Sequence, residues 1–168
     1  MASKSAKGAD MLLQMHRHGL VSLKATWFLD GVAIGQSRTN RSLLYGSADA
    51  TVQGTSWRFQ QQDRRAWVVL DAAGRTSVTA VSLGRATIQF RVEAAGRQID
   101  MWQPTWRGRL QIGEPNRGAS RVEMSRYGRT LCVVLPNDLE PVSAIFMLWL
   151  AAVTLDGVSA RAGMAISF

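Results

Sequence analysis

The most apolar stretch of the chain, LEPVSAIFMLWLAAVTLDG at residues 139–157, constrains the fold more than any other feature. No charged side chain lies between Glu140 and Asp156. The uncharged part, about fourteen residues, would form a helix of roughly 21 Å at 1.5 Å per residue, whereas a membrane span takes about 20 residues. Neither end is flanked by Lys or Arg, which also argues against a span.

The same stretch carries the signals of a helix that is enclosed by protein. Asn137 or Asp138 can cap its N-terminus, and Pro141 suits the first turn. The pair Asp156-Gly157 predicts its end. Between these signals, apolar residues occupy every angular position and leave no polar stripe for water. We therefore predict a buried helix near residues 140–155.

Most of the chain upstream of this helix has the pattern of short strands. In ATIQFRV, the residues Ile88, Phe90 and Val92 share one face and polar residues occupy the other. In RQIDMWQ, Ile99 and Met101 alternate with polar residues and a tryptophan. Counting such segments from residue 11 to residue 135 predicts about a dozen strands and no long helix among them.

Turn signals separate these strands. Two segments, VVLDAAGRTSV and FRVEAAGRQID, look like copies of one hairpin. In each, an acidic residue (Asp71 or Glu93) is expected to start the turn, and the glycine three residues later to close it. Asp30-Gly31 and Tyr127-Gly128 predict two further hairpins.

The helix and the strands together predict a closed fold. An open sheet of about a dozen strands would expose long edges, which natural proteins avoid, and closure into a barrel removes them. A barrel of this size has a lumen too wide for side chains alone. The fold class that we predict is therefore mainly β: a closed antiparallel β-barrel of about 12 strands around a central hydrophobic C-terminal α-helix.

Serial hairpins with LDAAGR-type turns, followed by VLPNDLEPVSAIFMLWLAAVTLD, resemble the tubby C-terminal-like superfamily. This superfamily includes tubby domains, plant LURP-one-related proteins and phospholipid scramblases, and the short chain is more similar to the last two. The resemblance covers residues 11–157 and implies a closed barrel around a hydrophobic helix. We accordingly expect a flexible tail at residues 1–10 and one barrel domain at residues 11–168, whose end, VSARAGMAISF, adds a last short strand.

The activities known in that superfamily do not transfer residue by residue. Tubby domains bind phosphoinositides through Lys and Arg on the barrel surface, but no stretch of this chain matches that site. Scramblases carry a cysteine-rich segment and an acidic calcium-binding stretch beside the helix. This chain has the single cysteine Cys132 and offers only Asp156 after its helix, which is too few ligands for calcium.

Charge and cysteine content limit which partners and which cellular location we expect. The chain has 20 basic and 12 acidic residues and a net charge of +8, which favours anionic partners. Most of the basic residues are Arg in a chain rich in Ala, Gly and Val, and a GC-rich genome produces the same bias without a functional cause. One cysteine and no evident export signal predict a cytoplasmic protein, with peripheral membrane association as an option.

No motif predicts an enzyme. The chain lacks a G-x-S-x-G elbow, a P-loop and a dinucleotide fingerprint. His16 and His18 are its only histidines, and zinc needs at least three protein ligands. Cys132 lies in the apolar run TLCVVL, where we expect a buried, unreactive thiol. We predict no catalytic residue, no metal and no cofactor.

Basic and aromatic residues interleave in MWQPTWRGRLQIGEPNRGASR. On an expected strand from residue 107 to residue 112, Arg107 and Arg109 should face solvent, and Trp102 should lie opposite Met101. An outward Trp beside outward arginines can stack a base or sit at a lipid head-group boundary. The candidate residues for binding an anion or another ligand are Arg64, Arg65, Trp102, Arg107, Arg109 and Arg121. The alternative is that these arginines only decorate strand faces.

Three functions therefore stay open at this point. The first is a binding or scaffold module that docks on anionic phospholipid or a phosphorylated ligand through a basic barrel face. The second is nucleic-acid binding by the same face, with a steep dependence on salt. The third is a membrane-associated, scramblase-like protein. A protein partner without any small ligand is the default expectation.

Overall fold

The structure is a computed structural model, which describes residues 10–18, 24–41, 46–84, 87–105, 108–114, 117–125 and 129–165. Its strands are β1 (Asp10–Arg17), β2 (Lys24–Leu29), β3 (Val32–Arg41), β4 (Gly46–Val52), β5 (Thr55–Gln61), β6 (Ala66–Leu70), β7 (Thr76–Ser82), β8 (Gln89–Ala94), β9 (Arg97–Trp102), β10 (Gln111–Glu114), β11 (Gly118–Arg121), β12 (Glu123–Met124) and β13 (Thr130–Pro136). One helix, α1 (Pro141–Ala165), follows them.

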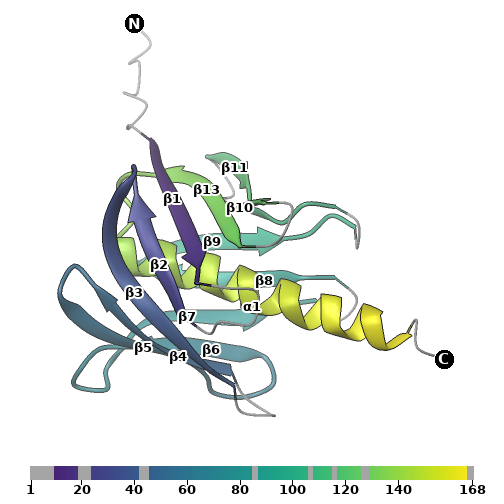
Figure 1. Cartoon of the computed structure of the whole chain (residues 1–168), viewed down its shortest axis with the longest axis horizontal. Helices are drawn as coiled ribbons and strands as arrows, with labels where there is room; N and C mark the ends of the chain where they lie inside the picture. Colours follow the sequence, from purple (N-terminus) through teal and green to yellow (C-terminus); the bar gives the residue numbers. More distant parts are fainter. Residues whose placement is uncertain are drawn as a thin grey trace, which may run out of the picture.

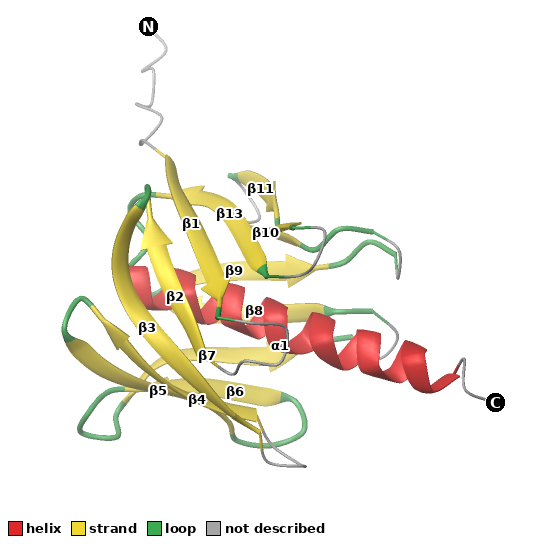
Figure 2. Ribbon diagram, in the orientation of Figure 1, coloured by secondary structure: helices red, strands yellow, loops and turns green. Residues whose placement is uncertain are grey.

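All strands belong to a single 13-stranded sheet in the order β11-β10-β9-β8-β7-β6-β5-β4-β3-β2-β1-β13-β12. Every pairing between strands is antiparallel. The sheet curls around α1 into a nearly closed barrel (Figures 1 and 2). The predicted fold class, a mainly β antiparallel barrel around a hydrophobic C-terminal helix, is confirmed.

The two edge strands of the sheet follow each other directly in the chain. β11 pairs with β10, and β12 pairs with β13 at the other edge of the sheet. Only Val122 separates β11 from β12, and its N–H donates to the carbonyl oxygen of Leu110 at 2.8 Å. We call the place where the two edges of the sheet meet the seam. One short segment crosses the seam by pairing first with β10 and then with β13, so neither edge is left as a long unpaired strand.

The interior of the barrel is filled by the uncharged part of α1. Every residue from Ala144 to Ala151 has no exposed surface. Around it lie the inward side chains of the strands, such as Leu13, Val69 and Val92, none of which is exposed. A helix that is apolar around its whole circumference is stable in water only when protein surrounds it on all sides, and the barrel meets that condition.

An aromatic cluster joins the helix to the wall of the barrel. The ring of Trp149 lies 5.4 Å from Phe59 on β5, 5.7 Å from Trp67 on β6 and 6.2 Å from Phe146 one turn earlier in α1. The indole N–H of Trp149 donates to Oγ1 of Thr39 on β3 at 3.0 Å. Because the polar atom of this tryptophan has a partner, its burial carries little desolvation cost.

The expected alternation is present in the strands. Ile88, Phe90 and Val92 are buried, and so are Ile99 and Met101, while the residues between them face outward. Asp30 and Gly31 have φ of 48° and 82°, as the hairpin signature predicts. The Tyr127-Gly128 hairpin lies outside the described residues.

The two similar hairpin sequences fold differently, which corrects the expectation that they are copies. Asp71 Oδ1 accepts hydrogen bonds from the backbone N–H groups of Ala73 and Arg75, each at 2.9 Å, and these bonds build the turn. Glu93 instead stays in β8, paired with Gln98, and the turn is the two-residue loop Ala95-Gly96. An aspartate side chain is short enough to accept from the backbone two residues ahead, whereas the glutamate is one methylene longer.

The helix differs from the prediction at both ends. It begins at Pro141 as expected, but its first backbone bonds run to the carbonyl oxygen of Glu140, and Asp138 forms ion pairs instead of a cap. It ends at Ala165, well beyond residue 155, so residues 158–165 are helical and do not form the expected last strand. Glycine permits a stop without enforcing one, and no proline follows Gly157 to break the hydrogen-bond ladder.

An ionic cluster lies next to the N-terminal end of α1 and joins residues from the two sides of the seam. Arg97 on β9 binds both Glu114 at the end of β10 and Asp138, the latter at 3.1 Å. Arg117 pairs with the same two acids, at 3.0 Å from Asp138 and 3.8 Å from Glu114. Four side chains from both sides of the seam thus meet next to the start of α1.

This cluster predicts a pH dependence of stability. Hydrogen bonds from Arg117 and Arg97 lower the pKa of Asp138 below its usual 3.8. A carboxyl whose pKa is lower in the folded state contributes its full stabilisation above the unfolded value, and loses it as the pH falls through the folded value. Wild type should therefore exceed Asp138→Asn in urea midpoint at about pH 7, and the difference should shrink below about pH 3.8.

The control is Asp49→Asn, which breaks the Arg58–Asp49 pair whose side chains are 61% and 56% exposed. Asp138 is 52% exposed, but it pairs with two arginines, of which Arg97 is only 22% exposed, whereas Asp49 pairs with one exposed arginine. A single exposed pair contributes little, so the urea midpoint of Asp49→Asn should stay near that of wild type throughout the same pH series. A difference between wild type and Asp138→Asn that is equal at both ends of the series would contradict the role given to the cluster.

Candidate binding surface

The two ends of the barrel differ in charge. We call the end where α1 starts the turn end, because the tight hairpins lie there. Its acidic residues, by position at strand ends and turns, are Asp10, Asp30, Asp71, Glu93, Glu114, Asp138 and Glu140. Its basic residues in the described chain are Arg75, Arg97 and Arg117. Among the described residues, acidic side chains therefore outnumber basic ones at the turn end.

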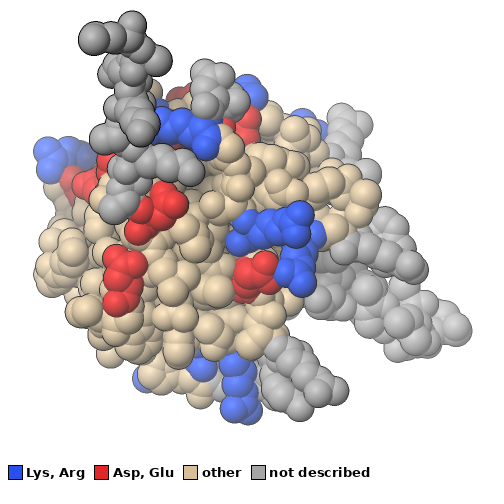
Figure 3. Space-filling view, turned by 90° about the horizontal axis from the view of Figure 1, so that it is seen from above, with Lys and Arg blue, Asp and Glu red and all other residues tan. Residues whose placement is uncertain are grey.

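The opposite end, where α1 leaves the barrel, is the exit end. Its described basic residues, which we call the exit rim, are Arg17, Lys24, Arg64, Arg65, Arg109, Arg121 and Arg129. The acidic residues in the same part of the described chain are Asp63, Glu123 and Asp156. In Figure 3, basic side chains with an acidic neighbour lie next to the grey segments on the side toward which α1 runs.

The exit rim divides into paired and unpaired arginines. Arg17 binds Asp156 at 3.1 Å, and Arg109 binds Glu123. Within the described residues, the exposed side chains of Arg64, Arg65, Arg121 and Arg129 form no ion pair. These four are the groups best placed to bind an external anion, because no internal carboxylate competes for them.

The structure brings most of the predicted candidates to this end. Arg64 and Arg65 lie in the β5–β6 turn, which Asp63 builds by accepting from the N–H groups of Arg65 and Ala66 at 2.7 and 2.9 Å. Trp102 ends β9, and Arg121 ends β11. Gln111 pairs with both of them, so Trp102 and Arg121 share the outer face about 10 Å apart.

One predicted candidate differs from expectation, and another is not described by the structure. Arg109 is exposed, but it is held by Glu123 and precedes β10, which begins at Gln111 and not at residue 107. Arg107 lies outside the described residues. The partner Glu123 belongs to the far edge of the sheet, so closure of the barrel creates this ion pair, and strand periodicity alone could not predict it.

Sequence reasoning missed Arg17 and Arg129. They lie more than a hundred residues apart, yet the N–H of Arg17 donates to the carbonyl oxygen of Arg129 at 2.8 Å. The pairing of β1 with β13 brings them together. No local pattern in the sequence marks either residue, because the contact depends on the register of strands from opposite ends of the chain.

The histidines and the cysteine occupy the outer surface. His16 contacts the ring of Phe28 at 4.7 Å, and Nε2 of His18 lies 2.6 Å from Oγ1 of Thr26. Cys132 is half-buried on the outer face of β13, opposite Glu123, and not in the core as expected. Burial, aided by the negative charge of Glu123, raises the pKa of its thiol, which disfavours the reactive thiolate.

Two searches of the described residues were negative. They contain no cluster of three or more His, Cys, Asp or Glu that could hold a metal ion. Within the same part of the chain, no helix combines the length and apolarity that crossing a membrane requires.

Comparisons with protein-family models, with curated proteins and with solved structures find no match to this chain. The fold therefore defines the protein only at the level of its architecture. It is a nearly closed antiparallel β-barrel built around one apolar helix, and its described residues are charged oppositely at the two ends.

Proposed function

We propose that this protein is a non-enzymatic binding module that docks on anionic phospholipid through its exit rim. The observation that carries the proposal is the group of four exposed arginines at one end of the barrel that form no ion pair with any described residue, namely Arg64, Arg65, Arg121 and Arg129. Seven of the twelve acidic residues lie at the other end. This uneven distribution of charge favours an orientation with the exit rim toward a negative surface.

The course of α1 supports the same orientation. Its backbone continues to Ala165 and projects past the strand ends on the exit side (Figure 1). Val153 and Leu155, where the helix leaves the barrel, are only half-buried. Leu155 directly precedes Asp156, which binds Arg17. Partly exposed apolar side chains near basic residues favour the interfacial region of an anionic bilayer. We extend the proposal to kinship with the tubby C-terminal-like superfamily, which rests on the same barrel-and-helix architecture.

Vesicle flotation tests the proposal. The protein should float with vesicles that contain phosphatidylserine in addition to phosphatidylcholine, and remain unbound with phosphatidylcholine alone. Each basic residue near an anionic surface contributes about 1 kcal/mol. The double variant Arg64→Gln/Arg65→Gln should therefore weaken partitioning by about 2 kcal/mol, or about 30-fold.

The matched control is Arg58→Gln/Arg75→Gln. It removes the same net charge, but Arg58 lies in the middle of β5 and Arg75 in a turn at the turn end. Partitioning that falls equally in both double variants would show a general effect of net charge and overturn the proposed surface. Retention on single-stranded RNA, without any binding to the phosphatidylserine vesicles, would also overturn it.

A further inference from the structure

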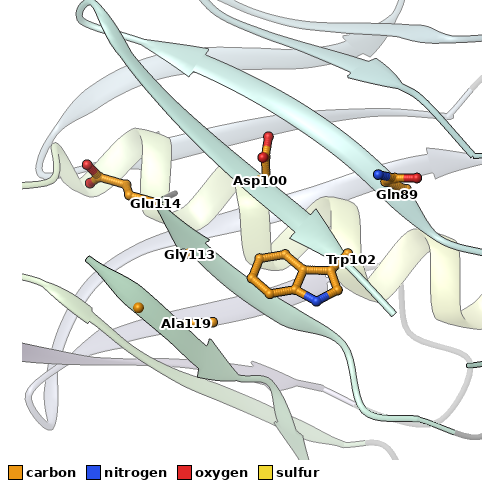
Figure 4. A pocket seen from close by; sticks show the side chains of 7 residues that line it. Gln89, Asp100, Trp102, Gly113, Glu114 and Ala119 are labelled. Atoms are coloured by element: carbon orange, nitrogen blue, oxygen red, sulfur yellow. The ribbon is translucent and has the colours of Figure 1, made fainter. Parts of the chain in front are cut away.

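A groove lies on the outer face of the barrel, over strands β8 to β11. It is a shallow hollow of about 370 Å³ that is open to solvent on one side. Its lining residues are Gln89, Asp100, Trp102, Gly113, Glu114, Gly118 and Ala119. Figure 4 shows the indole of Trp102 at the end of β9, beside β10, with Gln89 and Asp100 on the same side of the sheet.

The groove exists because β10 and β11 carry almost no side chains there. Gly113 pairs with Ala119 in the ladder, and Gly118 follows the preceding turn. A Cβ atom on Gly113 would overlap the carbonyl oxygen of Gly118 and come within 2.7 Å of Cα of Ala119. The close approach of the two backbones thus requires glycine at position 113. Because no large side chain projects from the strands there, the bottom of the groove is flat and lies beside the indole ring of Trp102.

The charges around the groove are already balanced within the protein. Oδ1 of Asp100 lies 3.3 Å from Nε of Arg91. Glu114 pairs with Arg97 and, at 3.8 Å, with Arg117. A cationic ligand would have to compete with these arginines for the carboxylates, and an anionic ligand would meet two carboxylates among the lining residues. The groove therefore favours a neutral ligand.

The remaining groups specify what kind of neutral ligand fits. The indole face of Trp102 offers a flat apolar surface. Oδ2 of Asp100 can accept a hydrogen bond while Oδ1 remains with Arg91. The amide of Gln89 can both donate and accept. A ring with one apolar face and several hydroxyl groups at its edge would use all three.

We infer that this groove binds a neutral saccharide, whose C–H face stacks on Trp102 while its hydroxyls bind Asp100 and Gln89. This site uses none of the exit-rim residues, although Trp102 lies on the same face as Arg121, and it does not depend on the proposed docking to lipid. Like most small-ligand sites, it combines apolar contact area with a few polar groups that fix orientation.

Titration of the ¹⁵N-labelled protein with cellobiose, maltose and N,N′-diacetylchitobiose tests the inference. At least one disaccharide should produce saturable shifts of the amides of β8–β11 and of the indole N–H of Trp102. Trp102→Ala and Ala119→Leu should each weaken binding at least tenfold, the first by removing the platform and the second by filling the floor. Phe28→Ala, which removes an aromatic ring from the outer face of β2, should leave binding unchanged.

Three results would overturn the inference. The first is the absence of shifts with all three disaccharides at tens of millimolar. The second is binding that survives Ala119→Leu in a protein whose amide spectrum shows it is folded. The third is tighter binding in the same groove of tetramethylammonium or inorganic phosphate, which would assign the groove to a charged ligand. None of these results bears on vesicle flotation, so the two proposals fail independently.

Discussion

Replacing Trp149 by alanine should destabilise the folded protein by about 3–5 kcal/mol, the cost typical of removing a large aromatic side chain from a core. The side chain has no exposed surface and contacts three aromatic rings from α1, β5 and β6. Its loss would leave a cavity between the helix and the barrel wall, and Oγ1 of Thr39 without its donor. Urea unfolding followed by circular dichroism measures the change.

Trp102→Ala is the matched control, because it deletes the same side chain from the outer face of the barrel. Trp102 is half-buried, so its loss should cost about 1 kcal/mol. Two variants with equal losses of stability would mean that Trp149 is no better enclosed than a surface residue. The same comparison establishes that Trp102→Ala is folded when saccharide binding is measured.

Met147→Lys should be about as damaging at neutral pH. Met147 is fully buried in the middle of α1, and the uncharged segment of the helix provides no counter-ion. Burial lowers the pKa of a lysine by as much as about 3–5 units. A shift of about 3 units corresponds to about 4 kcal/mol, which is a large part of the stability of a typical domain.

The sign of the pH effect distinguishes a buried charge from a steric defect. The folded pKa of the new lysine would lie below its unfolded value of about 10.4. The penalty is then complete below the folded pKa and shrinks as the pH rises toward the unfolded one. The stability of Met147→Lys relative to wild type should accordingly improve between about pH 7 and pH 10.

Val81→Lys is the control for this experiment. Val81 lies on the outer face of β7 and is 44% exposed, so a lysine there stays solvated and should change stability by no more than about 0.5 kcal/mol. A Met147→Lys variant as stable as Val81→Lys at neutral pH would mean that the helix is not the core of the barrel.

The prediction of the barrel from sequence succeeded because it used two local signals. Alternation such as that of Ile88, Phe90 and Val92 follows from the two-residue period of a strand and needs no knowledge of its neighbours. The uncharged segment before Asp156 could be neither a surface helix nor a full membrane span. A chain that forms a sheet of many strands and one helix that must be enclosed has few possible folds other than a barrel around the helix.

Signals that permit a structure without requiring it were less informative. Gly157 allowed the helix to end but did not stop it, and Glu93 resembled Asp71 without the geometry to build the same turn. Cys132 stands in an apolar run, yet its side chain faces outward because its neighbours Leu131 and Val133 take the inner positions. In each case the residue type was compatible with two environments, and packing against other segments selected one.

The binding surfaces were the features that the sequence predicted least well. Among the predicted residues, Arg64, Arg121 and Trp102 do come to one end of the barrel, but their grouping follows from which strand ends point the same way. The pairing of Arg109 with Glu123, the meeting of Arg17 and Arg129, and the hollow at Gly113 all depend on closure and register.

Hydrophobic periodicity and the absence of charge in one segment were therefore sufficient to establish the fold class and the burial of the helix, since both are properties of neighbouring residues. The segregation of charge between the two ends and the groove beside Trp102 arose when strands distant in sequence came together. Antiparallel pairing determines which side chains share an edge or a face, and a shift of one residue in register would send each of them to the other side of the sheet.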